Sequence, residues 1–145
     1  MTLWVVVDSG IFLKTVLPED YSDEADKLFK HWQQQGVNLA APSLFQYEVI
    51  SVLRKSVVRK VITEAQAQQA LLIFSNLTIA YSLEYHLLSR AYELATQLNR
   101  PTAYDAQYLA LAEHLQCEFW TQDERLYNAV RSQLKWVKWL GTAAP

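Results

Sequence analysis

Four acidic residues stand at positions where a carboxylate is costly to place. Asp8 follows the apolar run WVVV and Asp123 follows the segment CEFWTQ, so each comes directly after a predicted buried strand. Glu48 and Asp105 fall on or beside the apolar stripes of predicted helices. If the four meet, each pair would repel by about 4 kcal/mol at roughly 4 Å and an effective dielectric near 20. Such a cluster favours either raised pKa values or a bound cation.

The sequence places no Cys or His set beside these acids, so the available ligands are oxygens. Oxygen ligands indicate Mg²⁺ or Mn²⁺. Such ions bind phosphate oxygens, generate hydroxide from bound water and stabilise the leaving oxygen of an in-line displacement. The chemistry that the four acids favour is therefore phosphodiester hydrolysis.

Each acid also has a purely structural explanation. Asp8 could accept hydrogen bonds from the backbone of its own turn. Asp105 and Asp123 could cap the helices that they begin, and Asp105 would complement a helix dipole. Glu48 could reach solvent from the edge of its stripe. Taken singly, these explanations are as good as a functional one or better, and only the combination of all four points to one site.

The hydrophobic pattern alternates between predicted strands and predicted helices. This alternation is typical of right-handed crossovers and a parallel sheet covered on both faces, a three-layer α/β fold. Ligands of such sheets bind beyond the carboxyl ends of the strands. If the first and fourth strands are neighbours, Asp8 and Asp123 open into one crevice. Strands are expected at residues 3–7, 37–41, 77–81, 117–121 and 136–140, and helices at 22–35, 43–60, 63–76, 85–98, 102–115 and 123–132.

Several helix boundaries carry capping signals. Ser43 with Gln46 and Thr63 with Gln66 have the spacing of a capping box. Thr102 follows the break at Arg100-Pro101 and is expected to cap the next helix.

The segments that carry the acids resemble the PIN-domain nucleases, and among them the VapC-type toxins of bacterial toxin–antitoxin pairs. The resemblance rests on VVVDSG, LFQYEV, AYDAQYLALA and FWTQDERL, in that order. It extends over essentially the whole chain, which we interpret as a single PIN-like domain spanning residues 1–145.

The resemblance implies a three-layer α/β/α sandwich whose five-stranded parallel sheet has the order 3-2-1-4-5. It also implies that the four acids bind one or two Mg²⁺ or Mn²⁺ ions and cleave RNA. Ser9 and Thr121 match hydroxyl residues that support the site in relatives. Gly10 departs from the pattern, because many relatives carry Ser or Asn at that position.

The resemblance further implies protein partners. Toxins of this type usually form homodimers and are neutralised by an antitoxin. The antitoxin's C-terminal segment lies over the active site and often inserts a basic side chain there.

The chain has a slightly negative net charge but contains one strongly basic segment. Thirteen Lys and Arg against fifteen Asp and Glu give a net charge of −2, and leaving out the four candidate ligands turns it to +2. We hypothesise that the RKSVVRK stretch guides the RNA backbone towards the metal. A solvated helix end whose cations complement the dipole explains the stretch equally well. Its cations are Arg54, Lys55, Arg59 and Lys60.

The cysteine, histidine and hydrophobic patterns argue against disulfides, a histidine metal site and a membrane span. Cys117 is the single cysteine, so no internal disulfide can form, and His31, His86 and His114 lack ligand spacing. No apolar run approaches the roughly 18 residues of a membrane span, and the N-terminus does not resemble a signal peptide, so we expect a cytoplasmic protein.

Other functions are compatible with an α/β fold but fit these features less well. A PIN-like module that binds RNA or protein without cleavage is the main alternative, although all four acids are present. A phosphate-binding domain would need a glycine-rich loop, and the chain has only three glycines. A receiver domain would need an acidic pair near Asp8, and a haloacid-dehalogenase-type phosphatase would need an aspartate where Gly10 stands.

Overall fold

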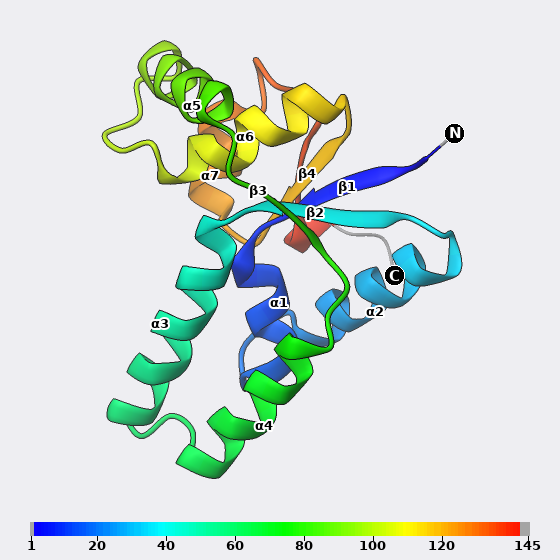
Figure 1. Cartoon of the computed structure of the whole chain (residues 1–145), viewed down its shortest axis with the longest axis vertical. Helices are drawn as coiled ribbons and strands as arrows, with labels where there is room; N and C mark the ends of the chain where they lie inside the picture. Colours follow the sequence, from blue (N-terminus) through cyan, green and yellow to red (C-terminus); the bar gives the residue numbers. More distant parts are fainter. Residues whose placement is uncertain (1, 143–145) are drawn as a thin grey trace.

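A five-stranded parallel sheet runs through the middle of the molecule in a computed structural model that describes residues 2–142 (Figure 1). The strand order is β3-β2-β1-β4-β5, so β1 is the central strand and β4 is its neighbour. This order confirms the fold expected from the resemblance. The strands are β1 (Trp4–Val7), β2 (Asn38–Pro42), β3 (Ala80–Ser82), β4 (Glu118–Thr121) and β5 (Val137–Trp139).

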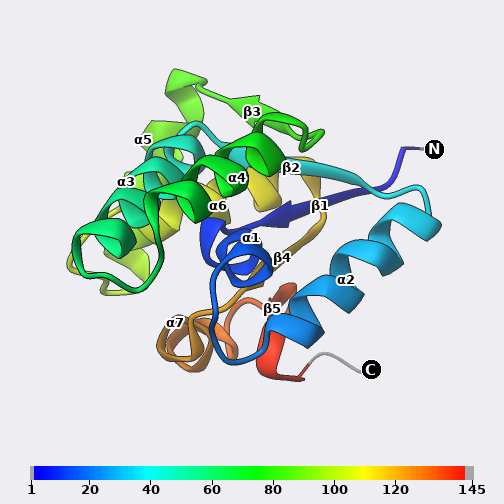
Figure 2. The ribbon, with the colours of Figure 1, turned by 90° about the horizontal axis from the view of Figure 1, so that it is seen from below.

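Helices cover both faces of the sheet and complete the three layers. One face carries α1 (Ser9–Val16), α2 (Ser22–Gln34), α3 (Leu44–Val58) and α4 (Glu64–Ser75), with α3 and α4 side by side (Figures 1 and 2). The other face carries α5 (Tyr85–Gln97), α6 (Tyr104–Leu115) and α7 (Glu124–Val130), and the short 3₁₀ helix η1 (Leu140–Thr142) follows β5. Within residues 2–142, no helix is long and apolar enough to cross a membrane.

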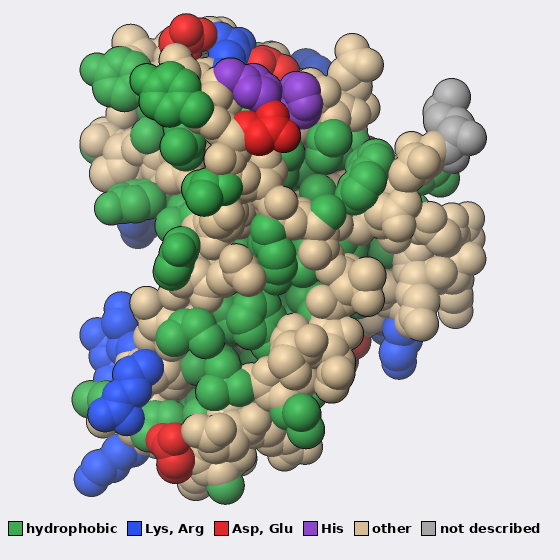
Figure 3. Space-filling model, in the orientation of Figure 1, with side chains coloured by type: hydrophobic (Ala, Val, Ile, Leu, Met, Phe, Trp, Pro, Cys, Tyr) green, Lys and Arg blue, Asp and Glu red, His purple; other side chains and the backbone are tan. Residues whose placement is uncertain are grey.

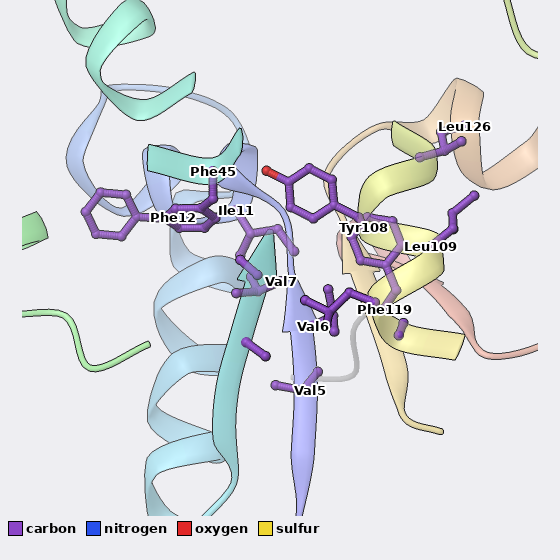
Figure 4. Close-up of a cluster of buried hydrophobic side chains, with 14 of the residues drawn as sticks. Val5, Val6, Val7, Ile11, Phe12, Phe45, Tyr108, Leu109, Phe119 and Leu126 are labelled. Atoms are coloured by element: carbon purple, nitrogen blue, oxygen red, sulfur yellow. The ribbon is translucent and has the colours of Figure 1, made fainter. Parts of the chain in front are cut away.

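Hydrophobic side chains pack against both faces of β1. This packing fixes the position of the strand and therefore of its carboxyl end. Val6 and Val7 are fully buried, with Phe45 of α3 on one side and Phe119 and Leu109 on the other (Figure 4). Burial of each such side chain contributes about 1.5–3 kcal/mol. Any shift of β1 along its axis would forfeit this packing, so the residue that follows Val7 has a well-determined position.

The first helix was not predicted, because its sequence SGIFLKTV contains a glycine and several β-branched residues with weak helix propensity. It forms because Asp8 caps it: the backbone N–H of Ile11 donates to Asp8 Oδ1 at 2.9 Å. Ile11, Phe12 and Leu13 are buried against the sheet and stabilise it further. Tertiary packing therefore overrides local propensity here.

The capping predictions had mixed outcomes. Thr63 and Gln66 form the reciprocal capping box. The prediction for Ser43 was wrong, because its hydroxyl donates instead to the carbonyl of Ser82, 3.2 Å away at the end of β3. Thr102 was also wrongly predicted as a cap, since α6 has Ala103 at its N-cap.

The end of α3 also differs from the expectation. The helix stops at Val58, and Lys60 adopts a left-handed backbone with φ of 61°. The last two cations of the basic segment, Arg59 and Lys60, therefore lie in the turn beyond the helix.

Candidate active site

The four predicted acids line one cavity of about 550 Å³ at the carboxyl ends of β1 and β4. Asp8 and Asp123 come from the ends of these neighbouring strands, while Glu48 projects from the first half of α3 and Asp105 from the first turn of α6. The backbone N–H of Asp8 donates to Trp120 O at 3.1 Å, which continues the β1–β4 pairing to the cavity edge. The topology thus brings together residues far apart in the sequence.

Asp8 is held by three hydrogen-bond donors. Ile11 N–H donates to Oδ1, while the Thr121 hydroxyl and the Gln122 backbone N–H donate to Oδ2. Thr121 is fully buried, and its hydroxyl oxygen also accepts from Asp123 N–H at 3.0 Å. One threonine side chain therefore contacts two of the four acidic residues. Asp123 also caps α7, since its Oδ1 accepts from Leu126 N–H at 3.1 Å.

Glu48 is oriented by two hydroxyl groups. Ser9 Oγ donates to Glu48 Oε1 at 3.1 Å, and the Tyr108 hydroxyl donates to the same oxygen. Tyr108 is buried, stacks on Phe119 and directs its oxygen away from α6 towards the opposite wall (Figure 4). Both bonds end on Oε1, and within residues 2–142 Oε2 has no such donor, which leaves it available to a cation.

Two neighbours of the acids were missed by the sequence reasoning. Tyr108 follows Asp105 by three residues, a spacing that places both on one helix face and could have flagged the tyrosine. Arg100 lies before α6, and its Nη2 is 3.7 Å from Asp105 Oδ2. No spacing in the sequence signals that ion pair.

Burial raises the pKa of three of the acids. Electrostatic repulsion from another acid of the cavity raises each of these pKa values further. The pKa of Asp8 rises to about 7 through burial, with a smaller contribution from Glu48. The pKa of Glu48 is raised by burial and by Asp105, and that of Asp105 by burial and by Asp123. Hydrogen bonds and Arg100 oppose these shifts without cancelling them. Ionisation of all the acids together is therefore unfavourable unless a cation is bound.

This donor set fits a hard divalent cation. Its side chains offer carboxylate oxygens, and the donors around them hold two of the carboxylates in fixed orientations. Carboxylates with oxygen-rich surroundings suit Mg²⁺ and Mn²⁺. That the four acids act as metal ligands stays a prediction.

The basic segment lies apart from the cavity. Lys55 and Arg59 follow Glu48 by seven and eleven residues, about 10 and 16 Å along the helix direction. Lys and Arg side chains gather at that end of α3 (Figure 3), and none of the four predicted cations lines the cavity. Any role in RNA binding would therefore concern the path of the RNA strand outside the cavity.

Gly10 has a physical reason to differ from the expected Ser or Asn. A Cβ atom at this position would lie 2.2 Å from Cγ of Gln122. Gln122 also holds Asp8 through its backbone N–H. The absence of a side chain at Gly10 thus leaves space for the side chain of Gln122, whose backbone N–H donates to Asp8.

The PIN domain family model matches residues 5–131, and the chain belongs to this family. The chain is similar to Ribonuclease VapC9 of Mycobacterium tuberculosis, with 34% identity over 95 residues that cover 66% of this chain and 72% of the relative.

Two solved structures share the fold. PAE2754 from Pyrobaculum aerophilum has a TM-score of 0.69 and 24% identity, covering 98% of this chain and 94% of that one. A toxin–antitoxin complex from Klebsiella pneumoniae has a TM-score of 0.64 and 18% identity, covering 92% and 94%. At these identities the likeness supports the fold alone.

The raised pKa of Asp8 predicts an unusual pH dependence for the metal-free protein. The carboxyl holds its proton up to about pH 7 when folded but releases it near 3.8 when unfolded. Its stabilising contribution is thus complete below pH 3.8 and is lost as the pH rises through about 7. We expect the free energy of unfolding, measured by urea denaturation in EDTA, to fall by about 2–3 kcal/mol between roughly pH 5 and pH 8. Asp8→Asn should flatten the profile, and a wild-type profile identical to that of the variant would refute the assignment.

Proposed function

We propose that this chain is a Mg²⁺- or Mn²⁺-dependent endoribonuclease and the toxin of a toxin–antitoxin pair. The observation that carries the proposal is the convergence of Asp8, Glu48, Asp105 and Asp123 in one cavity. Burial and neighbouring acids raise the pKa of the first three, which disfavours their joint ionisation without a cation. Membership of the PIN-domain family and similarity to a VapC ribonuclease support RNA as the substrate.

The residues of the cavity have distinct tasks in this proposal. A bound dication would activate water and stabilise the leaving oxygen of the phosphodiester. Thr121 fixes Asp8, and Tyr108 with Ser9 fixes Glu48, so two ligands are oriented before the metal arrives. Arg100, paired with Asp105, offsets part of the cavity's negative charge, which otherwise opposes the approach of a phosphate.

Removal of a single acid should abolish cleavage. Asp8→Asn and Asp105→Asn, incubated with structured RNA and Mn²⁺, are expected to lose at least about 100-fold in rate, because ligand loss exceeds the roughly 10–100-fold effect of losing a neighbour that orients a ligand. Asp23→Asn, an exposed acid in the first turn of α2, is the matched control and should cleave normally. Cleavage that survives EDTA or either cavity substitution would contradict the mechanism.

Tyr108 should act as a positioning residue for Glu48. Tyr108→Phe removes only the hydroxyl and is expected to reduce cleavage about 10–100-fold at limiting Mn²⁺. Excess Mn²⁺ should restore most of the rate, because the ligand itself remains. Tyr104→Phe changes an exposed tyrosine of the same helix and serves as the control. A loss that no Mn²⁺ concentration relieves would argue against this role.

We further infer that Arg54, Lys55, Arg59 and Lys60 guide the RNA backbone. All four side chains are exposed, and α3 connects them to Glu48 at the cavity. In this arrangement the strand would follow the exposed surface of α3 towards the metal.

Charge reversal tests this RNA path. The double variant Lys55→Glu with Arg59→Glu should bind RNA more weakly, and its slope of log affinity against log salt should flatten by about 1.4, or 0.7 per lost phosphate contact. Lys27→Glu with Lys135→Glu makes the same charge change at exposed positions elsewhere. An unchanged slope in the first variant, or an equal change in the control, would exclude the α3 path.

The proposed toxin function includes an antitoxin as a protein partner. A cavity lined by four acids is suited to a basic side chain, which supports an antitoxin whose C-terminal segment covers the site. Homodimerisation and a cytoplasmic location remain predictions, the first of which light scattering can measure.

A further inference from the structure

A second group of potential metal ligands lies outside the acidic cavity. Glu84, His86 and His114 place one ligand atom each within 4.8 Å of one another. Glu84 is the N-cap of α5, His86 lies in its first turn, and His114 lies in the last turn of α6. The two imidazoles sit together with acidic side chains beside them on the surface of this helical layer (Figure 3). We name this group the histidine cluster.

The spacing of His86 and His114 in the sequence does not indicate a shared ligand set. The two are far apart in the chain and come together only because α5 packs against α6. Arg90 of α5 also contacts α6. Its Nε and Nη2 donate to the two carboxylate oxygens of Glu113 at 2.7 and 3.0 Å. The cluster therefore lies next to a fixed helix–helix contact.

The ligand types distinguish this cluster from the cavity. Two imidazoles and one carboxylate form a set that zinc enzymes use, with a water molecule completing the tetrahedron. Nitrogen ligands favour Zn²⁺ over Mg²⁺, which prefers oxygen. The carboxylate cavity and the histidine cluster would therefore select different metals.

The geometry needs only small side-chain adjustments. His86 Nδ1 is 3.3 Å from Glu84 Oε2, close to the roughly 3.3–3.6 Å between two ligands of a tetrahedral Zn²⁺. The imidazole rings of His86 and His114 have centroids 5.3 Å apart and planes inclined by 65°, so they meet edge to face. All three side chains are exposed, and rotation about their side-chain bonds can bring in the remaining ligand atom.

We propose that Glu84, His86 and His114 bind a Zn²⁺ ion that joins the start of α5 to the end of α6. His114 lies nine residues after Asp105 on α6, about 13 Å along the helix axis, so this ion would be separate from any ion in the cavity. Its effect would be structural, because it would cross-link α5 to α6, the helix that packs on β1 and β2. The proposal does not depend on nuclease activity.

Calorimetric titration with Zn²⁺ tests the site directly. In excess Mg²⁺, which occupies oxygen ligands, the wild-type protein should bind one Zn²⁺ with micromolar or tighter affinity and unfold at a higher temperature. His86→Ala and His114→Ala should each weaken binding by at least about tenfold and abolish the thermal shift. Replacing Zn²⁺ with Co²⁺ should give a visible absorption band in the wild type that both variants lack.

Two controls separate this site from the others. His31→Ala removes an exposed histidine at the end of α2 and should bind Zn²⁺ like the wild type. Asp105→Asn disables the cavity and should also leave Zn²⁺ binding unchanged, so the outcome is independent of the nuclease proposal. Circular dichroism would establish that each variant is folded. Wild-type affinity in both His86→Ala and His114→Ala, or no saturable binding by the wild type, would overturn the proposal.

Discussion

The carboxylate of Asp8 lies where a buried strand, a helix and a second strand meet, and the rest of the site is arranged around it. One of its oxygens caps α1, and the other accepts hydrogen bonds from Thr121 and Gln122 beside β4. Removal of this carboxylate would therefore affect α1, β4 and the cavity together. Burial at the same time raises its pKa to about 7, so the charged form is disfavoured unless a cation is present. The same side chain therefore holds three structural elements together and favours the binding of a cation.

Structural and functional explanations of the acids turn out to be compatible. Asp8 and Asp123 both act as helix N-caps, and the positive ends of α1 and α7 favour their negative charges. A cap also fixes the direction of a short side chain without recruiting another residue. Thr121 connects the two caps through its single hydroxyl. The helix starts and the cavity are thus built from the same hydrogen bonds.

The sequence was most informative where a property is local. Strand ends, apolar stripes and the Thr63 capping box are all recorded in residues close together in the chain, and they led to the acids, the parallel sheet and the start of α4. Ser43 was mispredicted because a distant carbonyl, that of Ser82, competes for its hydroxyl. The roles of Tyr108 and His114 depend on how α6 packs. Such contacts between distant segments leave no periodic signal in the sequence.

The proximity of Gly10 to Gln122 has a consequence for substitutions at position 10. A side chain at position 10 and the present path of Gln122 would occupy the same space, with only 2.2 Å between Cβ and Cγ. A substitution of Gly10 would therefore require the Gln122 side chain to take another rotamer, and this exposed side chain has solvent to move into. The orientation of Gln122 in this structure thus depends on the absence of a side chain at position 10.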